Sequence, residues 1–248
     1  MNLVERLLGL DEAGERAVLF TVLEGDGAGG KLLVFESGET EGDGPAELAA
    51  HAGDLLRGGR NKLLELDGRR VFSEVYGPPP RLLIYGAVDT AESLCRAAKL
   101  LGWTTIVADA RAKFATAERI PSADEIIVEW PEQAFERAEP DHATAVVVLT
   151  HDDKFDVPAL KAALASEAFY IGALGSRRNQ ERRRERLLEA GVDEDLLSRI
   201  SGPCGLDIGA DSNEETAVSI LAEALAVRAR RGGGPLRESK HRIHVEVR

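Results

Sequence analysis

The sequence predicts an α/β protein with a doubly wound parallel sheet and a smaller N-terminal α/β domain. Strand-like and helix-like segments alternate over residues 78–231, which is typical of parallel strands joined by helical crossovers. Ala145–Leu149 is an almost continuous β-branched run, as expected of a strand buried on both faces. Gly77-Pro78-Pro79-Pro80 cannot join a helix or a central strand, so we predict a stiff connector between domains of residues 1–77 and 78–231.

The first 77 residues carry the signals of the small α/β domain. The spacing of apolar residues predicts helices over residues 3–8 and Pro45–Leu56. Strands are predicted at Ala17–Leu23, Lys31–Phe35, Asn61–Leu66 and Arg70–Val75. The last two strands flank Asp67-Gly68, a dipeptide that favours the tight turn of a β-hairpin.

The longer segment follows a regular order of strands and helices. Strands are predicted at Arg81–Tyr85, Thr104–Ala108, Glu125–Glu129, Ala145–Leu149 and Phe169–Ile171. Helices are predicted over residues 89–101, 156–166, 176–190, 193–199 and 213–231. Ser212-Asn213-Glu214-Glu215 fits a capping box at the start of the last helix. The tail, residues 232–248, alternates weakly at Ile243, Val245 and Val247 and predicts either an edge strand or disorder.

Composition narrows the class of protein. The 248 residues are 44% hydrophobic, which excludes collagen-like, disordered and disulfide-scaffold proteins. The net charge of −12 argues against a nucleic-acid partner. Because there is no apolar run of roughly 18 residues and no signal-peptide pattern, we expect no membrane partner and a cytoplasmic location. The two cysteines fit a reducing compartment; Cys95 is predicted in the core, and Cys204 is predicted to be packed rather than reactive.

The carboxyl ends of the predicted strands define one rim on which a ligand is expected. The loops after the first, second, fourth and fifth strands bring together residues suited to binding phosphate or a nucleotide. The candidate binding residues on this rim are Gly86, Ala87, Asp109, Arg111, Thr150, His151, Gly172, Ala173, Leu174, Gly175, Ser176, Arg177 and Arg178.

The loop after the first strand is similar to a dinucleotide fingerprint, Gly-x-Gly-x-x-Gly, but departs from it. Val88 stands where the second glycine is needed, and Asp89 adds a carboxylate that would repel a phosphate. The alternative is a plain strand-to-helix turn in which Asp89 caps the helix itself. Asp109 lies 23 residues after Gly86, a spacing that fits a ribose-binding acid as well as an ordinary turn residue, and Arg111 would favour a phosphate.

The loop after the fifth strand is the stronger anion-binding candidate. Its two glycines permit close backbone approach, Ser176 can cap the next helix, and Arg177 and Arg178 supply forked donors for phosphate oxygens. In the alternative, the basic run 177–186 is a solvated face that pairs with its own Glu181 and Glu185.

The polar run after the fourth strand, His151-Asp152-Asp153, has two interpretations. It fits loop capping, and it could also serve a metal or a proton transfer. No partner residues have metal-ligand spacing, so no metal is predicted.

At these loops the chain resembles the XdhC/CoxI family of molybdenum-enzyme maturation factors. The resemblance rests on PPPRLLIYGA (78–87), FATAERIPSADEIIV (114–128), AVVVLTHDDKFDVPAL (145–160), FYIGALGSRRNQERRRERL (169–187) and GPCGLDIGADSNEETAVSILAEA (202–224). It implies a C-terminal Rossmann-like domain preceded by a smaller XdhC/CoxI-type domain. It also implies an accessory protein, commonly a dimer, that binds the molybdenum cofactor (molybdopterin or its dinucleotide form) or a related nucleotide and helps to mature a xanthine or carbon monoxide dehydrogenase. A molybdoenzyme client and a sulfur-transfer protein are the partners implied.

Three departures from the family pattern concern cofactor handling, one of which is the absence of a second family cysteine site before the linker. Family members have Gly-Ala-Gly-His where this chain has Gly86-Ala87-Val88-Asp89, and Gly-Gly-Cys where it has Thr40–Pro45 without a cysteine. Two other functions therefore stay open. One is an NAD(P)-dependent oxidoreductase with His151 as proton donor, and the other is a non-catalytic protein-interaction subunit.

Overall fold

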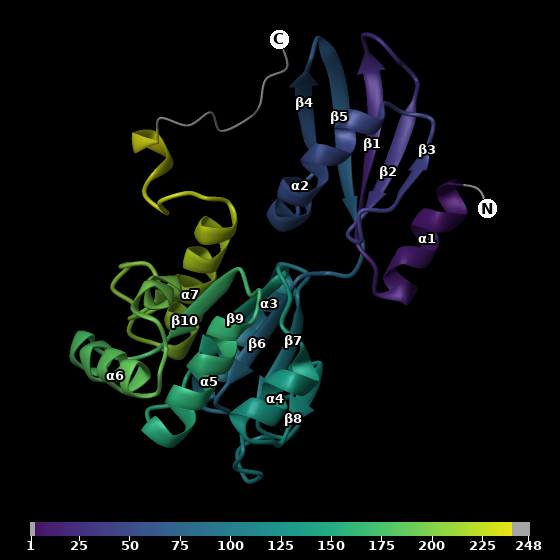
Figure 1. The fold of residues 1–248 in the computed structure, drawn as a ribbon. Helices are drawn as coiled ribbons and strands as arrows, with labels where there is room; N and C mark the ends of the chain where they lie inside the picture. The colour runs from purple at the N-terminus through teal and green to yellow at the C-terminus, as the bar shows by residue number, and fades with distance from the viewer. Residues whose placement is uncertain (1–2, 240–248) are drawn as a thin grey trace. The chain divides into compact units, whose positions relative to one another are not determined.

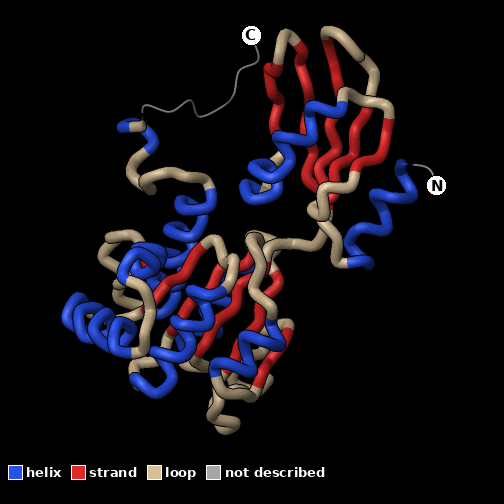
Figure 2. The backbone as a smooth tube through the Cα atoms, in the orientation of Figure 1, coloured by secondary structure: helices blue, strands red, loops and turns tan. Residues whose placement is uncertain are grey.

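The structure, a computed structural model, describes residues 3–239, which form two compact units (Figures 1 and 2). Among the described residues, the first unit contains residues 3–78 and 234–239, and the second contains residues 79–233. The predicted alternation at Ile243, Val245 and Val247 lies outside the described residues. No helix in residues 3–239 has the length and apolar character needed to cross a bilayer.

The N-terminal unit is a five-stranded antiparallel sheet with helices on both faces. Its strands lie in the order β3-β2-β1-β5-β4. They are β1 (Ala17–Glu24), β2 (Lys31–Phe35), β3 (Thr40–Gly42), β4 (Lys62–Leu66) and β5 (Arg69–Tyr76). The helices are α1 (Leu3–Ala13), η1 (Ala46–His51) and α2 (Ala52–Gly58).

Alternation along β1 builds the two cores of this unit. Val18 and Phe20 pack in one cluster with residues of α2, whereas Leu19 packs on the opposite face with Leu10 of α1. The predicted hairpin is confirmed, because β4 and β5 are joined through Asp67-Gly68. Both turn residues have positive φ, 50° and 77°, as a two-residue turn between twisted strands requires.

The C-terminal unit confirms the predicted doubly wound, Rossmann-like parallel sheet. All five strand pairings are parallel, and the order is β11-β10-β9-β6-β7-β8. The strands are β6 (Arg81–Tyr85), β7 (Thr104–Ala108), β8 (Glu125–Ile127), β9 (Thr144–Val148), β10 (Tyr170–Ala173) and β11 (Ile200–Ser201). From β6 the chain winds first through β7 and β8 and then returns to β9 on the other side. The switch point, where ligands bind in such sheets, therefore lies between β6 and β9.

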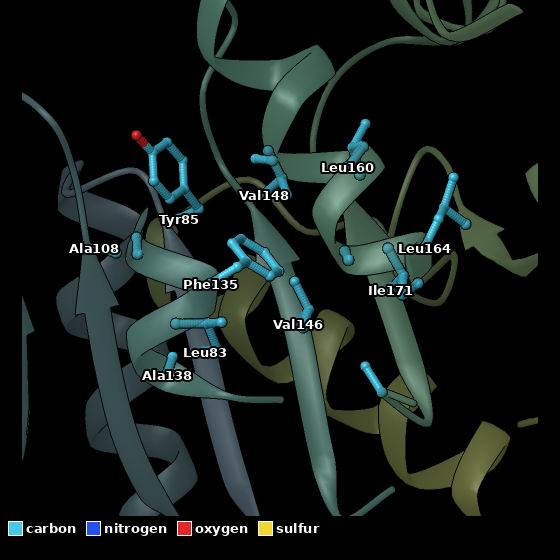
Figure 3. Packing of buried hydrophobic residues seen from close by; sticks show 14 of the residues in the cluster. Leu83, Tyr85, Ala108, Phe135, Ala138, Val146, Val148, Leu160, Leu164 and Ile171 are labelled. Carbon is cyan, nitrogen blue, oxygen red and sulfur yellow. The ribbon is translucent and has the colours of Figure 1, made fainter. Parts of the chain in front are cut away.

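Helices cover both faces of this sheet. They are α3 (Asp89–Leu100), α4 (Pro131–Ala138), α5 (Asp153–Ala165), α6 (Arg177–Glu189), η2 (Glu194–Arg199) and α7 (Asn213–Arg228). The α3 and α7 helices pack together over one face, and α4, α5 and α6 pack side by side over the other. Figure 3 shows the core on the face covered by α4, α5 and α6, which contains Phe135 of α4 and Leu160 of α5 together with the strand residues Leu83 and Val146. All four side chains are at most 5% exposed.

Four elements were not predicted, and each is short: β3, β11, α4 and the 3-10 helix η3 (Leu236–Glu238). The β3 and β11 strands have three and two residues, so they are defined by their neighbours rather than by a pattern of their own. The α4 helix spans only eight residues, with Pro131 at its first position.

Helix boundaries also differ from the prediction. The α5 helix begins at Asp153 and not at residue 156, because the Asp152 side chain caps its first turn, and Pro158 lies inside the helix. The predicted capping box of α7 is confirmed: Glu215 N donates to Ser212 Oγ at 3.1 Å, and Ser212 N donates to the Glu215 carboxylate at 3.0 Å. The α7 helix ends at Arg228 rather than at residue 231.

Candidate functional site: the carboxyl edge of the parallel sheet

The loops after β6 and β9 touch at the switch point, and Gly86 makes this contact possible. Gly86 has φ +118°, and its N–H donates to Ala108 O at 2.8 Å. A β-carbon at this position would lie 3.0 Å from Thr150 Cγ2 and 3.1 Å from Thr150 N. Glycine is therefore required by backbone conformation and by close packing between strands, independently of any phosphate.

The start of α3 is not a turn capped by Asp89, so that interpretation is wrong. Val88 is the N-cap residue, and no side chain caps the helix. Asp89 has helical geometry as the first residue of α3, and a capping residue must instead stand just before the helix. Its carboxylate is exposed and forms an ion pair with Arg119 at 3.1 Å.

Asp109 joins the ends of β6 and β7. Its side chain is 1% exposed. One carboxylate oxygen accepts a hydrogen bond from Ala87 N at 2.9 Å, and Arg111 donates to both oxygens from Nε at 2.9 Å and Nη2 at 2.8 Å. Burial pushes the pKa of Asp109 upward, but the hydrogen bonds from Arg111 and Ala87 outweigh it and hold the pKa below its usual value. Both carboxylate oxygens of this candidate ribose-binding residue therefore already accept hydrogen bonds from the protein itself.

Arg111 is fixed in place by aromatic rings as well as by Asp109. Its guanidinium carbon lies 4.4 Å from the ring centre of Phe114 and 5.5 Å from that of Phe155. Hydrogen bonding to Asp109 raises the pKa of Arg111. In this arrangement the Arg111 guanidinium has a structural role at the rim, held between Asp109 and two aromatic rings.

Of the polar run after β9, Asp152 and Asp153 form structural contacts and His151 is exposed to solvent. Asp152 Oδ1 accepts from Lys154 N at 3.2 Å, so the loop-capping interpretation is confirmed for this residue. Asp153 pairs with Arg182 at 3.5 Å, while His151 is exposed. Within residues 3–239 no three His, Cys, Asp or Glu side chains are grouped as a metal site would need.

The loop after β10 begins buried and ends at the start of α6. Ala173 is fully buried, and Leu174 N donates to Val148 O at 2.9 Å, which ties the loop to the end of β9. Gly172 has a packing role, because a β-carbon there would lie 2.8 Å from the Tyr170 hydroxyl oxygen. Gly175 has φ +137°, a conformation that favours glycine.

The first turn of α6 carries the two unpaired arginines of the rim. Ser176 caps this helix, as predicted, by accepting from Asn179 N at 3.3 Å. Arg177 and Arg178 are exposed, and neither forms an ion pair with any residue of the described chain. Two such guanidinium groups beside a helix N-terminus suit an anion.

The other exposed arginines of α6 are paired, but not with Glu181 and Glu185. Arg182 and Arg186 both approach Asp153 of α5, at 3.5 and 3.8 Å. Arg184 pairs with Glu194 of η2. Arg186 also pairs within the helix, but with Glu189 at 3.4 Å. The predicted pairing with Glu181 and Glu185 is therefore wrong.

Sequence reasoning missed two buried polar residues near this rim, Asp156 and Arg183, and the half-buried Gln180 beside them. Arg183 is 5% exposed and donates to the Asp156 carboxylate at 2.7 Å. A signal was present in the sequence, because Arg183 stands four residues before Leu187 and so shares its buried helix face. The surrounding run of arginines concealed it.

Both cysteines should resist alkylation by iodoacetamide in the folded protein at pH 8. Burial raises the pKa of the Cys95 thiol to about 12, and burial together with the nearby Glu223 carboxylate raises that of Cys204 to about 12. Only about one thiol in ten thousand is then ionised at pH 8, against roughly one in four for an ordinary cysteine. Cys95 is fully buried in the core, as predicted.

Mass spectrometry after a short pulse of reagent checks this expectation. Both thiols should be modified within the same pulse once the chain is unfolded in urea. Rapid modification of Cys204 in the folded protein would contradict it.

Comparison with known proteins assigns this site to a family. Residues 82–224, which include the whole rim, match the XdhC Rossmann domain. The chain belongs to the XdhC family. The resemblance to this family is therefore confirmed for the Rossmann-like domain.

Relatives of this XdhC-family chain include two bacterial proteins with descriptive names. It is 34% identical over 160 residues to a probable xanthine dehydrogenase subunit of Bacillus subtilis (strain 168), which is 64% of this chain and 46% of that protein. It is 31% identical over 157 residues to the molybdenum cofactor insertion chaperone PaoD of Escherichia coli (strain K12), which is 63% of this chain and 43% of that protein. The matched region thus spans less than half of each relative.

A solved structure is also similar. A crystal structure described as a xanthine dehydrogenase from Bacillus halodurans matches with a TM-score of 0.67 and 27% sequence identity. The match covers 94% of this chain and 66% of that one.

Proposed function

We propose that this chain is an accessory protein that carries the molybdenum cofactor, or a related nucleotide, to a molybdoenzyme of the xanthine or carbon monoxide dehydrogenase type. The observation that carries the proposal is the pair of unpaired arginines, Arg177 and Arg178, at the carboxyl edge of the sheet. Membership of the XdhC family and the similarity to a cofactor insertion chaperone support it. In this role the protein has no turnover of its own.

The residues of the rim fit the phosphate end of such a cargo. Arg177 and Arg178 offer charged donors, and the first turn of α6 offers the positive end of a helix dipole. Among the described residues no thiol is available for the molybdenum end, because Cys95 and Cys204 are packed with raised pKa values. We therefore propose that this chain holds the cofactor through its phosphate or nucleotide part, and that a sulfur-transfer partner or the client supplies any thiol chemistry.

The dinucleotide-dependent oxidoreductase is the weaker candidate. Val88 occupies the place of the second glycine, and Asp109 is already bound by Arg111 and Ala87. One observation favours the oxidoreductase: the strand order puts Gly86 at a switch point of the kind at which dinucleotides bind. A cytoplasmic location, suggested by the free cysteines, and a homodimeric state belong to the proposal as well.

Isothermal titration calorimetry with isolated molybdopterin dinucleotides, CMP, GMP, NAD and NADP tests the proposal. We expect a molybdopterin dinucleotide to bind the native chain and to lose at least about tenfold in affinity in the Arg177→Ala/Arg178→Ala variant. A hydrogen bond to a charged group contributes about 1.5–3 kcal/mol, and 1.4 kcal/mol is a factor of ten.

The matched control is Arg182→Ala/Arg186→Ala, which removes the same charge from the same helix. Its affinity should stay within about twofold of the native value, since these arginines are already paired with Asp153. Hydride transfer with NAD or NADP would replace the proposal by the oxidoreductase. Absence of binding to every ligand would leave a protein-interaction subunit.

A further inference from the structure

A buried ion pair links α5 to α6, the helix whose first turn carries the proposed anion site. Arg183 of α6 and Asp156 of α5 are 5% and 4% exposed, and Arg183 Nη2 lies 2.7 Å from Asp156 Oδ2. The same Nη2 also donates to Leu174 O at 3.0 Å, and Nη1 donates to Gln180 Oε1 at 2.6 Å. One guanidinium therefore ties together two helices and the loop after β10.

Gln180 and Thr150 extend this network to both neighbouring loops. Gln180 Nε2 donates to Ala173 O at 3.1 Å. On the other side, the Thr150 hydroxyl donates to the second carboxylate oxygen of Asp156. The network thus joins the loop after β9, in which Thr150 lies, to the loop that ends at the first turn of α6.

A contribution to folding stability is a poor explanation for a buried ion pair of this kind. Desolvating two charges costs about as much as their attraction returns, and well-packed apolar residues often replace a buried pair without loss. The Nε atom of Arg183 is in addition buried without a hydrogen-bond partner, which adds a further cost. What the pair supplies is geometry, because the forked guanidinium accepts only one arrangement of its three partners.

We propose that Arg183 and Asp156 are positioning residues that fix the loop Ala173–Ser176 and the start of α6, so that Arg177 and Arg178 are held ready for a phosphate group. This inference rests on the proposed function. Arg183 follows Arg177 by six residues on the same helix, so a shift at the pair moves the first turn with it. Holding the site in its binding arrangement removes the ordering cost that a mobile loop would add to binding.

The test separates position from stability by replacing both charges at once. In the Asp156→Leu/Arg183→Met variant we expect a melting temperature close to the native one. We expect the affinity for pyrophosphate and for a molybdopterin dinucleotide to fall by at least about tenfold. Amide hydrogen exchange should become at least about tenfold faster at Leu174 and Gln180, whose N–H groups donate to Val148 O and Ser176 O.

Gln180→Met provides a second variant that keeps the ion pair and removes only the hydrogen bonds of the Gln180 side chain. Gln180 is half-buried, so this variant should fold, and it should show the same direction of change in affinity and exchange. If either folded variant binds pyrophosphate as the native chain does and keeps native exchange rates, the positioning role is wrong. If the native chain binds no ligand, the proposed function fails, and the exchange rates alone then decide the positioning role.

Discussion

Gly86→Ala is expected to lower the free energy of unfolding by about 3–5 kcal/mol. Two costs combine. A non-glycine residue at φ +118° is strained by roughly 1–3 kcal/mol. The added carbon would also press on Thr150 N at 3.1 Å and on Leu149 C at 3.3 Å, which are backbone atoms that cannot rotate away.

Chemical denaturation of the native chain, Gly86→Ala and the control Gly102→Ala measures this effect. Gly102 also has positive φ, +71°, but a β-carbon there meets nothing within 4 Å. The control should therefore cost only about 1–2 kcal/mol. Equal losses in the two variants would show that the contact between the loops after β6 and β9 is not tight.

Asp109→Ala is expected to cost about 2–4 kcal/mol of stability. It leaves the buried Ala87 N–H without its acceptor and Arg111 without its counter-ion. The loss stays below that of a fully buried pair because the Arg111 side chain is 35% exposed and can be solvated. Asp109→Asn should lose less, since its amide oxygen can still accept from Ala87 N.

The contribution of Asp109 to the free energy of unfolding should fall as the pH is lowered. Its pKa is lower in the folded chain than in the unfolded chain, so the folded state favours the ionised form. The stabilisation is therefore complete above the unfolded value of about 3.9 and is lost as the pH falls from there through the lower folded value. The stability gap between the native chain and Asp109→Asn should narrow below about pH 4 in urea denaturation curves. A gap that widens on acidification would contradict this assignment.

Much of the fold could be predicted because its elements carry strong local patterns. The strand Arg81–Tyr85 and the strand Lys31–Phe35 were predicted to the residue, since each is a short apolar run with clear ends. The hairpin at Asp67-Gly68 followed from turn chemistry alone. The short strand Ile200–Ser201 could not be predicted, because two residues acquire strand geometry only by pairing with β10.

Part of the candidate site could likewise be predicted from the sequence, and part could not. The rim could be placed from the order of strands, since the carboxyl ends of parallel strands share one edge. The hydrogen-bond and ion-pair partners of each polar group could not be predicted from the sequence. Asp109 fits a ribose-binding acid by spacing, yet in the folded chain it is bound by Arg111 two residues later. Arg183 stands in a basic run, yet it is the buried member of that run.

The sequence by itself determined the class of fold, the edge on which a ligand is expected and the family, because these depend on periodicity, strand order and motifs that each lie within a few tens of residues. Only the tertiary structure decided which charges are paired. Whether an arginine binds a ligand or an internal carboxylate depends on which side chain the fold brings within about 3 Å of it, a range over which a charged hydrogen bond forms or fails. Among the described residues, that distance left Arg177 and Arg178 without an ion pair and tied Arg111 and Arg183 to Asp109 and Asp156.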